Sequence, residues 1–169
     1  MQERKPVYGK NLVYLFRPHS KASAMDGTVM AFVTENKRSK KVDTESTATK
    51  DGSIVSPSTM EQEITTKSYM AENDENMKVI EDAMDENELM DIWEANLQER
   101  AKSGTDKFAG RYFQGYLTQF EVTSSAEGYA EVATSFAING KGVKGDVTVT
   151  KEQQALADYM FADTPKTGA

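Results

Sequence analysis

The residue types that most often carry chemistry are scarce in this sequence of 169 residues. It has no cysteine and a single histidine, His19. The lack of cysteine excludes disulfides, thiol catalysis and thiolate metal sites, and a single histidine excludes paired-histidine zinc sites. His19 follows Pro18 in an expected turn at the end of a strand, where we predict no functional role for it. The remaining candidates for chemistry are a glycine-rich motif and a large number of carboxylates.

The glycine-rich segment 140–145 matches the G-x-G-x-x-G pattern of dinucleotide-binding proteins. In those proteins a helix follows the glycines, and its N-terminus binds the pyrophosphate. Here the β-branched residues of segment 146–150 predict a strand instead, and Asn139–Gly140 is typical of a hairpin turn. We therefore interpret the motif as a turn and expect no cofactor.

The carboxylates are concentrated in the middle of the chain. Residues 61–100 have a net charge of −10, whereas residues 1–60 have a net charge of +4. The acidic run from Glu72 to Asp91 lacks the glycine that an EF-hand loop needs at its sixth position, so we interpret it as a solvated helix face. A calcium- or ligand-binding module remains an alternative. No pair of acids is marked as buried, as general acid–base catalysis requires, and we expect no enzyme.

Strands dominate the predicted secondary structure. Apolar alternation and β-branched residues predict strands over 11–17, 28–36, 61–69, 89–97, 111–123, 129–138 and 147–149. The first of these has a continuous apolar run, which predicts burial on both faces. No apolar run is long enough to span a membrane. The pattern predicts a mainly β fold, an antiparallel β-sandwich or barrel with one flanking helix.

The flanking helix is predicted between residues 73 and 87. Asn73 is a suitable N-cap, and Asn87 is a suitable C-terminal stop. Between them, apolar residues from Met77 to Met84 recur at helical spacing and form one stripe. A second, short helix through Tyr159 is predicted from the capping-box pair Thr150 and Gln153.

Three segments of this single domain, residues 1–169, have little to bury: the N-terminal arm 1–9, the long segment 37–59 and the C-terminal arm 161–169. Segment 37–59 begins with four basic residues and continues with many threonines and serines. Asp51–Gly52 is a hairpin turn signal, so we predict a two-stranded arm that projects from the domain. An isolated two-stranded ribbon is marginally stable in water, so this arm needs a partner outside the domain. A loop without regular structure is the alternative.

Several short motifs occur in an order that resembles one family of structural proteins. The opening segment Tyr8–Arg17, YGKNLVYLFR, resembles the start of the major tail protein (tail tube protein) family of long-tailed phages infecting lactococci and related Gram-positive bacteria. The resemblance covers nearly the whole chain and continues through five further segments: 47–52, 93–94, 112–116, 136–140 and 161–164.

The resemblance implies a structural subunit of a phage tail tube, with two packed antiparallel sheets and a helix on the flank. Six copies would form a ring, and rings would stack into a hollow tube that conducts the genome during ejection. The partners would be further copies of the chain, the tape-measure protein and DNA inside the lumen without specific binding, and the tail-terminator and distal tail proteins at the ends. The protein would lie in the virion tail after assembly in the host cytoplasm, without a membrane partner.

In such families the termini and a long loop bridge neighbouring rings. The resemblance therefore implies two sets of inter-ring contacts. In the arm, these residues are Thr44, Glu45, Thr47, Thr49, Lys50, Asp51 and Gly52. In the termini, they are Tyr8, Gly9, Phe161, Asp163 and Thr164. The chain ends soon after the last motif, so we expect no additional immunoglobulin-like domain for decoration of the tail surface.

The predicted strand 61–69 has too few apolar residues for a core strand. Glu61 and Glu63 share one of its faces, and we expect them to line the lumen, with the outer surface of the tube as the alternative. The net charge of −7 per copy suits an acidic lumen, which repels phosphates and lets DNA slide. The alternative function is a tube subunit of a type VI-like contractile secretion machine, which uses a related fold.

Overall fold

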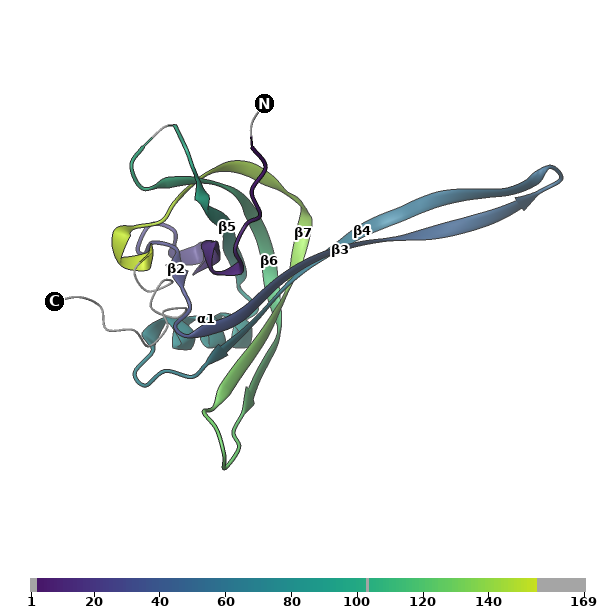
Figure 1. Cartoon of the computed structure of the whole chain (residues 1–169). Coiled ribbons are helices and arrows are strands. Elements are labelled where there is room, and N and C mark those ends of the chain that lie inside the picture. Colours follow the sequence, from purple (N-terminus) through teal and green to yellow (C-terminus); the bar gives the residue numbers. More distant parts are fainter. Residues whose placement is uncertain (1–2, 103, 155–169) are drawn as a thin grey trace.

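An antiparallel sheet and one helix make up most of the computed structural model, which describes residues 3–102 and 104–154 (Figure 1). The helix α1 spans Glu75–Asp85, and short 3-10 turns at Gly9–Asn11 and His19–Lys21 flank the first strand. The strands are β1 (Leu12–Pro18), β2 (Thr28–Val29), β3 (Val33–Thr49), β4 (Gly52–Tyr69), β5 (Leu89–Arg100), β6 (Lys107–Thr123) and β7 (Glu131–Thr148).

All seven strands belong to one sheet, in the order β2-β1-β5-β6-β7-β4-β3. The predicted mainly β fold with a flanking helix is confirmed, and hydrogen bonds join the strands into one sheet where the resemblance implied two. The sheet curls strongly. Phe16 in β1 stacks on Phe136 in β7 with ring centroids 5.0 Å apart, although β5 and β6 lie between these strands.

Two apolar clusters lie on opposite faces of the sheet. The larger fills the inside of the curl, where Met77 and Ile80 of α1 pack with side chains of the sheet such as Ile92. The smaller includes Val13 and Leu15 on the other face of β1. Because successive strand residues point to opposite faces, β1 contributes to both clusters. Its burial on both faces, predicted from the continuous apolar run, is confirmed.

The helix begins one residue later than predicted. Its N-cap is Asp74, whose carboxylate accepts a hydrogen bond from the Met77 N–H at 3.2 Å, and Asn73 has a positive φ of 55°. A carboxylate caps as well as an amide and also suits the positive end of the helix dipole. At the other end the chain leaves through Asn87, whose φ of 53° is tolerated by asparagine, as the predicted stop requires.

The glycine-rich segment is not the predicted turn, because β7 runs through it to Thr148. The β6–β7 register shifts here, since Tyr112 pairs with Val143 but Gln114 pairs with Asn139. Gly142 lies inside this irregularity with a φ of 80°, and a Cβ on it would overlap the ring of Phe113. The glycines therefore form a bulge that bends β7 around that ring.

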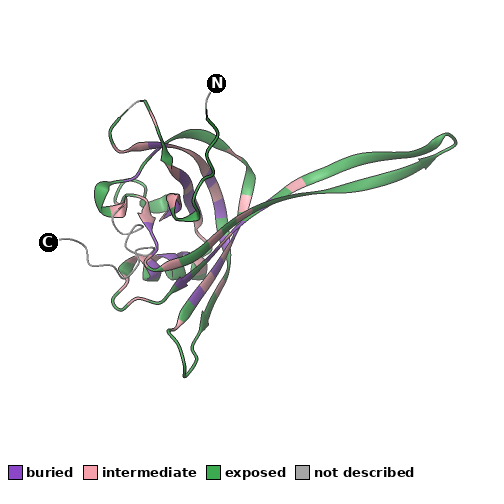
Figure 2. Ribbon diagram, in the orientation of Figure 1, coloured by how far each residue is buried: buried purple, intermediate pink, exposed green. Residues whose placement is uncertain are grey.

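Two long strands, β3 and β4, form a ribbon that extends well beyond the rest of the molecule (Figure 1). Near the body, alternate β4 residues from Gln62 to Ser68 are buried against the core. Farther out, residues 43–58 are all exposed (Figure 2). The same pair of strands therefore has a packed half and a solvated half.

Candidate assembly surfaces

The distal half of the ribbon, residues 43–58, is called the arm below. Thr49 pairs with Gly52, so its turn consists of Lys50 and Asp51, one residue earlier than the predicted pair. Gly52 has a φ of 132°, which disfavours other residues, and the Thr49 hydroxyl donates to its carbonyl at 2.6 Å. The seven arm residues predicted to bridge rings all lie at this exposed end of the molecule.

The arm carries two large apolar side chains, Ile54 and Val55. Their exposed fractions are 59% and 61%. Thr47 lies opposite Ile54 and Ser46 lies opposite Val55, so the two side chains point to opposite faces of the ribbon. Each face of the arm therefore offers one apolar group in a polar setting, which is suited to contact with another molecule.

At the base of the ribbon, Glu61 and Glu63 are exposed and point away from the core, because the intervening Gln62 is buried. Lys41 lies opposite Glu61, and Ser39 lies opposite Glu63. This sheet face therefore mixes basic and acidic groups. The same face continues across β7, where alternate residues are small.

A buried polar network lies where the ribbon joins the body. Arg38 of β3 donates to the Glu94 carboxylate of β5 at 2.6 Å, and its guanidinium also reaches Gln62 at 3.4 Å. The Tyr14 hydroxyl donates to the same carboxylate. Burial raises the pKa of Tyr14 well above its ordinary value, and the hydrogen bond to Glu94 raises it further. Tyr14 therefore stays protonated and keeps donating.

This network connects β3 at one edge of the sheet to β5 and β1 near the other edge. It therefore fixes the curl of the sheet at the point where the arm leaves the body. Sequence reasoning missed it, although a signal was present. Asp91 and Glu94 interrupt the otherwise apolar run of β5, and a charge in such a run is stable only when it is paired.

Asp91 is the centre of a second network and is fully buried. Arg17 donates to Oδ2 of its carboxylate at 3.0 Å, the Tyr112 hydroxyl donates to Oδ1, and Nδ1 of His19 lies 2.9 Å from the same Oδ1. Burial raises the pKa of Asp91, but hydrogen bonds from Tyr112, His19 and Arg17 lower it by more, so its pKa lies below the ordinary value. His19, expected to have no role, is thus a structural partner of Asp91.

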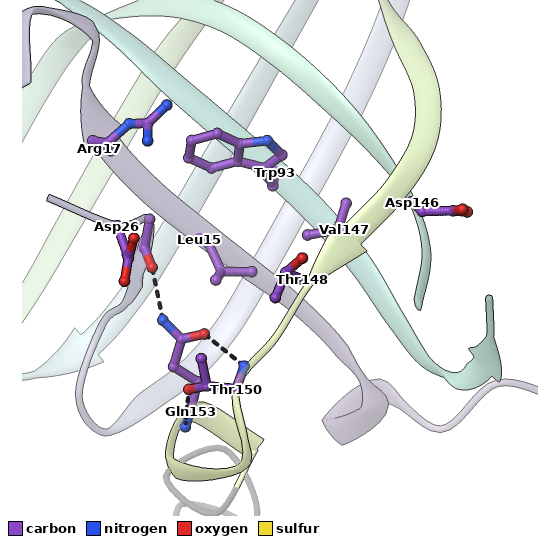
Figure 3. Close-up of a pocket in the computed structure, with 10 residues that line it drawn as sticks. Leu15, Arg17, Asp26, Trp93, Asp146, Val147, Thr148, Thr150 and Gln153 are labelled. Atoms are coloured by element: carbon purple, nitrogen blue, oxygen red, sulfur yellow. Dashed lines mark hydrogen bonds between the residues drawn. The ribbon is translucent and has the colours of Figure 1, made fainter. Parts of the chain in front are cut away.

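A pocket of about 310 Å³ lies beside this second network (Figure 3). The Arg17 guanidinium lies 4.8 Å from the centre of the Trp93 ring at its wall. Gln153 closes another side, where its side-chain amide donates to the Gly27 carbonyl at 2.7 Å. Thr150 and Gln153 exchange the two hydrogen bonds of a capping box, as predicted. The predicted helix end at Tyr159 lies outside the described residues.

The pocket does not have the composition of a catalytic centre. Its arginine is already paired with Asp91, and Leu15, Trp93 and Val147 form the apolar part of its wall. Within residues 3–102 and 104–154, no three histidine or acidic side chains are placed to hold a metal ion together. In the same part of the chain, no helix is long and apolar enough to span a membrane.

The predicted bridging residues of the termini are only partly described. Tyr8 and Gly9 are exposed, and the Tyr8 N–H donates to the side chain of Gln98 at 2.8 Å. This bond attaches the N-terminal segment to β5. Phe161, Asp163 and Thr164, with the C-terminal arm 161–169, lie outside the described residues.

Comparisons of sequence identify similar proteins in phage tails. A family model described as "Phage tail tube protein" matches residues 6–144. A tail protein of Staphylococcus phage phiMR25 is 33% identical over 162 residues, which cover 93% of this chain and 82% of that protein. The tail tube protein of Bacillus phage SPP1 is 23% identical over 88% of this chain, and the match spans 55% of its own length.

Comparisons of structure find the same fold in tubes. The SPP1 tail tube has a TM-score of 0.75 at 19% identity, over 89% of this chain and 86% of that one. The tail of a gene transfer agent particle with C6 symmetry has a TM-score of 0.60 at 11% identity, over 86% and 100%. The sheath–tube complex of an extracellular contractile injection system has a TM-score of 0.55 at 10% identity, over 84% and 93%.

Proposed function

The chain belongs to the phage tail tube protein family, and we propose that it forms homo-hexameric rings that stack into the tube of a long-tailed phage. Family membership makes it a structural component of the virion tail and not an enzyme. A tail tube is an assembly of subunits, so self-association is part of this function. The proposal adds the number of copies in a ring and the contacts that join the rings.

The two free edges of the sheet support ring formation. Among the strands of residues 3–102 and 104–154, β2 and β3 are the terminal ones, and the long β3 pairs with β4 alone. Such an exposed edge invites pairing with another chain, and closure of several sheets into a ring removes it. The C6 symmetry of the gene transfer agent tail, which has the same fold, supports six copies.

The arm is the observation that carries the proposal, because all of its residues are exposed and it extends away from its own body (Figure 2). A two-stranded ribbon gains little stability alone, so contact with a neighbouring ring would order it. We assign this contact to Thr44, Glu45, Thr47, Thr49 and Lys50–Gly52. Tyr8, Gly9 and the C-terminal residues named above would supply a second set of inter-ring contacts.

The sheet face that carries Glu61 and Glu63 is our candidate for the lumen. Glu61 and Glu63 are exposed on it, and β7 adds the small residues Ala133, Ser135 and Ala137 to the same face, which suits a passage for DNA and the tape-measure protein. The net charge of −7 per copy disfavours adhesion of phosphates. Lys41 lies opposite Glu61 and offsets its negative charge, so the repulsion of DNA phosphates would come mainly from the net charge of the whole subunit.

The similar proteins come from a Staphylococcus phage and a Bacillus phage, which supports a Gram-positive host. We propose that hosts related to lactococci fall within this range, that assembly takes place in the host cytoplasm, and that terminator and distal tail proteins bind the tube ends. A contractile machine is the second candidate, since an injection-system tube shares the fold. The family match favours the phage tail.

Negative-stain electron microscopy of the purified protein at low and high concentration tests the proposal. We expect rings or tubes with a central hole from the full-length chain. A variant without residues 43–56 should unfold as cooperatively as the full-length chain and form no long tubes. Wild-type tube lengths from this variant would contradict the role of the arm, and single small particles from the full-length chain at every concentration would contradict self-assembly.

A further inference from the structure

Exposed apolar side chains gather at both ends of the β3–β4 ribbon. The arm end carries Ile54 and Val55, as described above. At the other end, where β4 finishes, Tyr69, Met70 and Tyr129 have exposed fractions of 37%, 46% and 80%. These three residues are called the tyrosine patch below.

The tyrosine patch has a defined geometry. The rings of Tyr69 and Tyr129 meet edge to face with centroids 5.6 Å apart. The Met70 N–H donates to the carbonyl of Ala130 at 2.8 Å, which connects the end of β4 to the segment before β7. Scattered exposed apolar residues are ordinary on a protein surface, but a group of this kind at the end of a sheet indicates a contact surface.

We propose that the arm of one copy docks on the tyrosine patch of a second copy in the neighbouring ring, through the ribbon face that carries Val55. The inference rests on the proposed function, and it names the acceptor for the arm. Aromatic rings and a flexible thioether side chain adapt well to aliphatic groups, and Val55 offers such a group. The turn beyond Val55 has Lys50 beside Asp51, so these two side chains bring no net charge to the patch.

The positions of the two surfaces suit a contact that repeats. The arm and the tyrosine patch lie at opposite ends of the same two strands, because β4 starts at the arm turn and ends at Tyr69. Displacement of a second copy along the ribbon therefore brings its patch toward the arm of the first. The arm and the tyrosine patch are different surfaces, so each copy can bind one neighbour through its arm and another through its patch. The same contact can therefore repeat from ring to ring along a tube.

A disulfide test is direct because the chain has no cysteine. We would combine Val55→Cys with Met70→Cys, assemble tubes, oxidise them mildly and separate the products on a non-reducing gel. A disulfide requires Cα atoms within roughly 7 Å, so cross-linking reports true proximity. We expect a ladder of dimers, trimers and longer chains, because one contact connects each copy to the next.

Two controls sharpen the test. Val55→Cys alone should remain uncross-linked, and so should Val55→Cys combined with Val143→Cys, since Val143 is 66% exposed but lies outside the patch. Oxidised dimers without longer products would overturn the inference, because they indicate a symmetric contact. Tubes that form normally but yield no cross-links would overturn it while leaving the proposed function intact, whereas full-length protein without rings or tubes would contradict the proposed function.

A charge pair covers the case in which the cysteines disturb assembly. Val55→Glu alone and Met70→Lys alone should each shorten tubes at least tenfold, because each places a charge against an apolar group. The two substitutions in one chain should restore much of the length, since a glutamate would then face a lysine. Normal tubes from both single variants, or a double variant as defective as the single ones, would overturn the inference.

Discussion

The two halves of the β3–β4 ribbon share a hydrogen-bonded ladder and differ in everything that packs against it. From Met60 to Tyr69, alternate side chains enter the core, and β7 pairs on the other side. In the arm, residues 43–58 are exposed, and no third strand in the described part of the chain pairs with them. Backbone pairing alone therefore does not create a stable structure in this ribbon. The proximal half is stabilised by its own body, and the arm depends on another copy.

The largest expected difference in the free energy of unfolding is between substitutions of two isoleucines of β4. Ile64 is fully buried in the proximal half, whereas Ile54 is 59% exposed in the arm. Ile64→Ala should lower the free energy of unfolding by about 2–5 kcal/mol, because it leaves a cavity in the core. Ile54→Ala should change it by less than about 0.5 kcal/mol. Urea denaturation of both variants measures the difference, and equal losses would refute the contrast between the halves.

We expect a smaller change in the free energy of unfolding from a substitution at the junction between the halves. Arg38→Met keeps the bulk of the side chain but leaves the Glu94 carboxylate without its cation at a largely buried site. We expect a loss of about 1–3 kcal/mol in the free energy of unfolding. Lys41→Met is the matched control, because the Lys41 side chain is 72% exposed and its pairing with Asp43 is worth little. A similar loss in both variants would show that burial of the pair is unimportant.

The body should also respond to acid in a way that the arm does not. The pKa of Asp91 is lower in the folded chain than the ordinary value near 3.9, so its ionised form stabilises the fold above that pH. This stability should disappear as the pH falls from about 4 through the folded pKa. Asp91→Asn should cost about 1–2 kcal/mol at pH 7 and flatten the profile below pH 4. Urea denaturation from pH 7 to 2 measures both effects, and an unchanged acid limb would contradict the role of Asp91.

The smallest effect concerns the arm alone. In the free subunit, its backbone amides should exchange hydrogen near the rate of an unfolded chain, because the arm opens without unfolding the body. Amides of Gln62–Ser68 should exchange only in global unfolding. Hydrogen exchange with mass spectrometry compares the two halves directly. Strong protection of the arm in the monomer would mean that it is stable without a partner.

Local patterns were sufficient for the elements whose burial follows from their own sequence. The apolar run of β1 predicted two buried faces, and the stripe from Met77 predicted the side of α1 that packs on the core. The networks of Asp91 and Glu94 needed more than local patterns, because Arg17 and Arg38 reach them from distant segments. Their residues come together only through the strand order and the curl of the sheet.

The glycine-rich segment 140–145 shows a different limit of prediction from local sequence patterns. Asn139–Gly140 has the composition of a hairpin turn, yet the chain continues as a strand through a bulge. The bulge depends on the ring of Phe113 beneath Gly142, and that contact is invisible in a local window of sequence. A position that requires glycine for both its φ and a close approach satisfies the same pattern as a turn.

The slender arm has a mechanical consequence. A ribbon of two strands resists extension along its covalent backbones but bends readily out of its plane, because no third layer stiffens it. Rings connected through such ribbons would tilt relative to one another while each ring kept its own packed core. Curvature of the tube would then be distributed over the joints between rings, and the stiffness of the tail would be set by the arms and the surfaces that receive them.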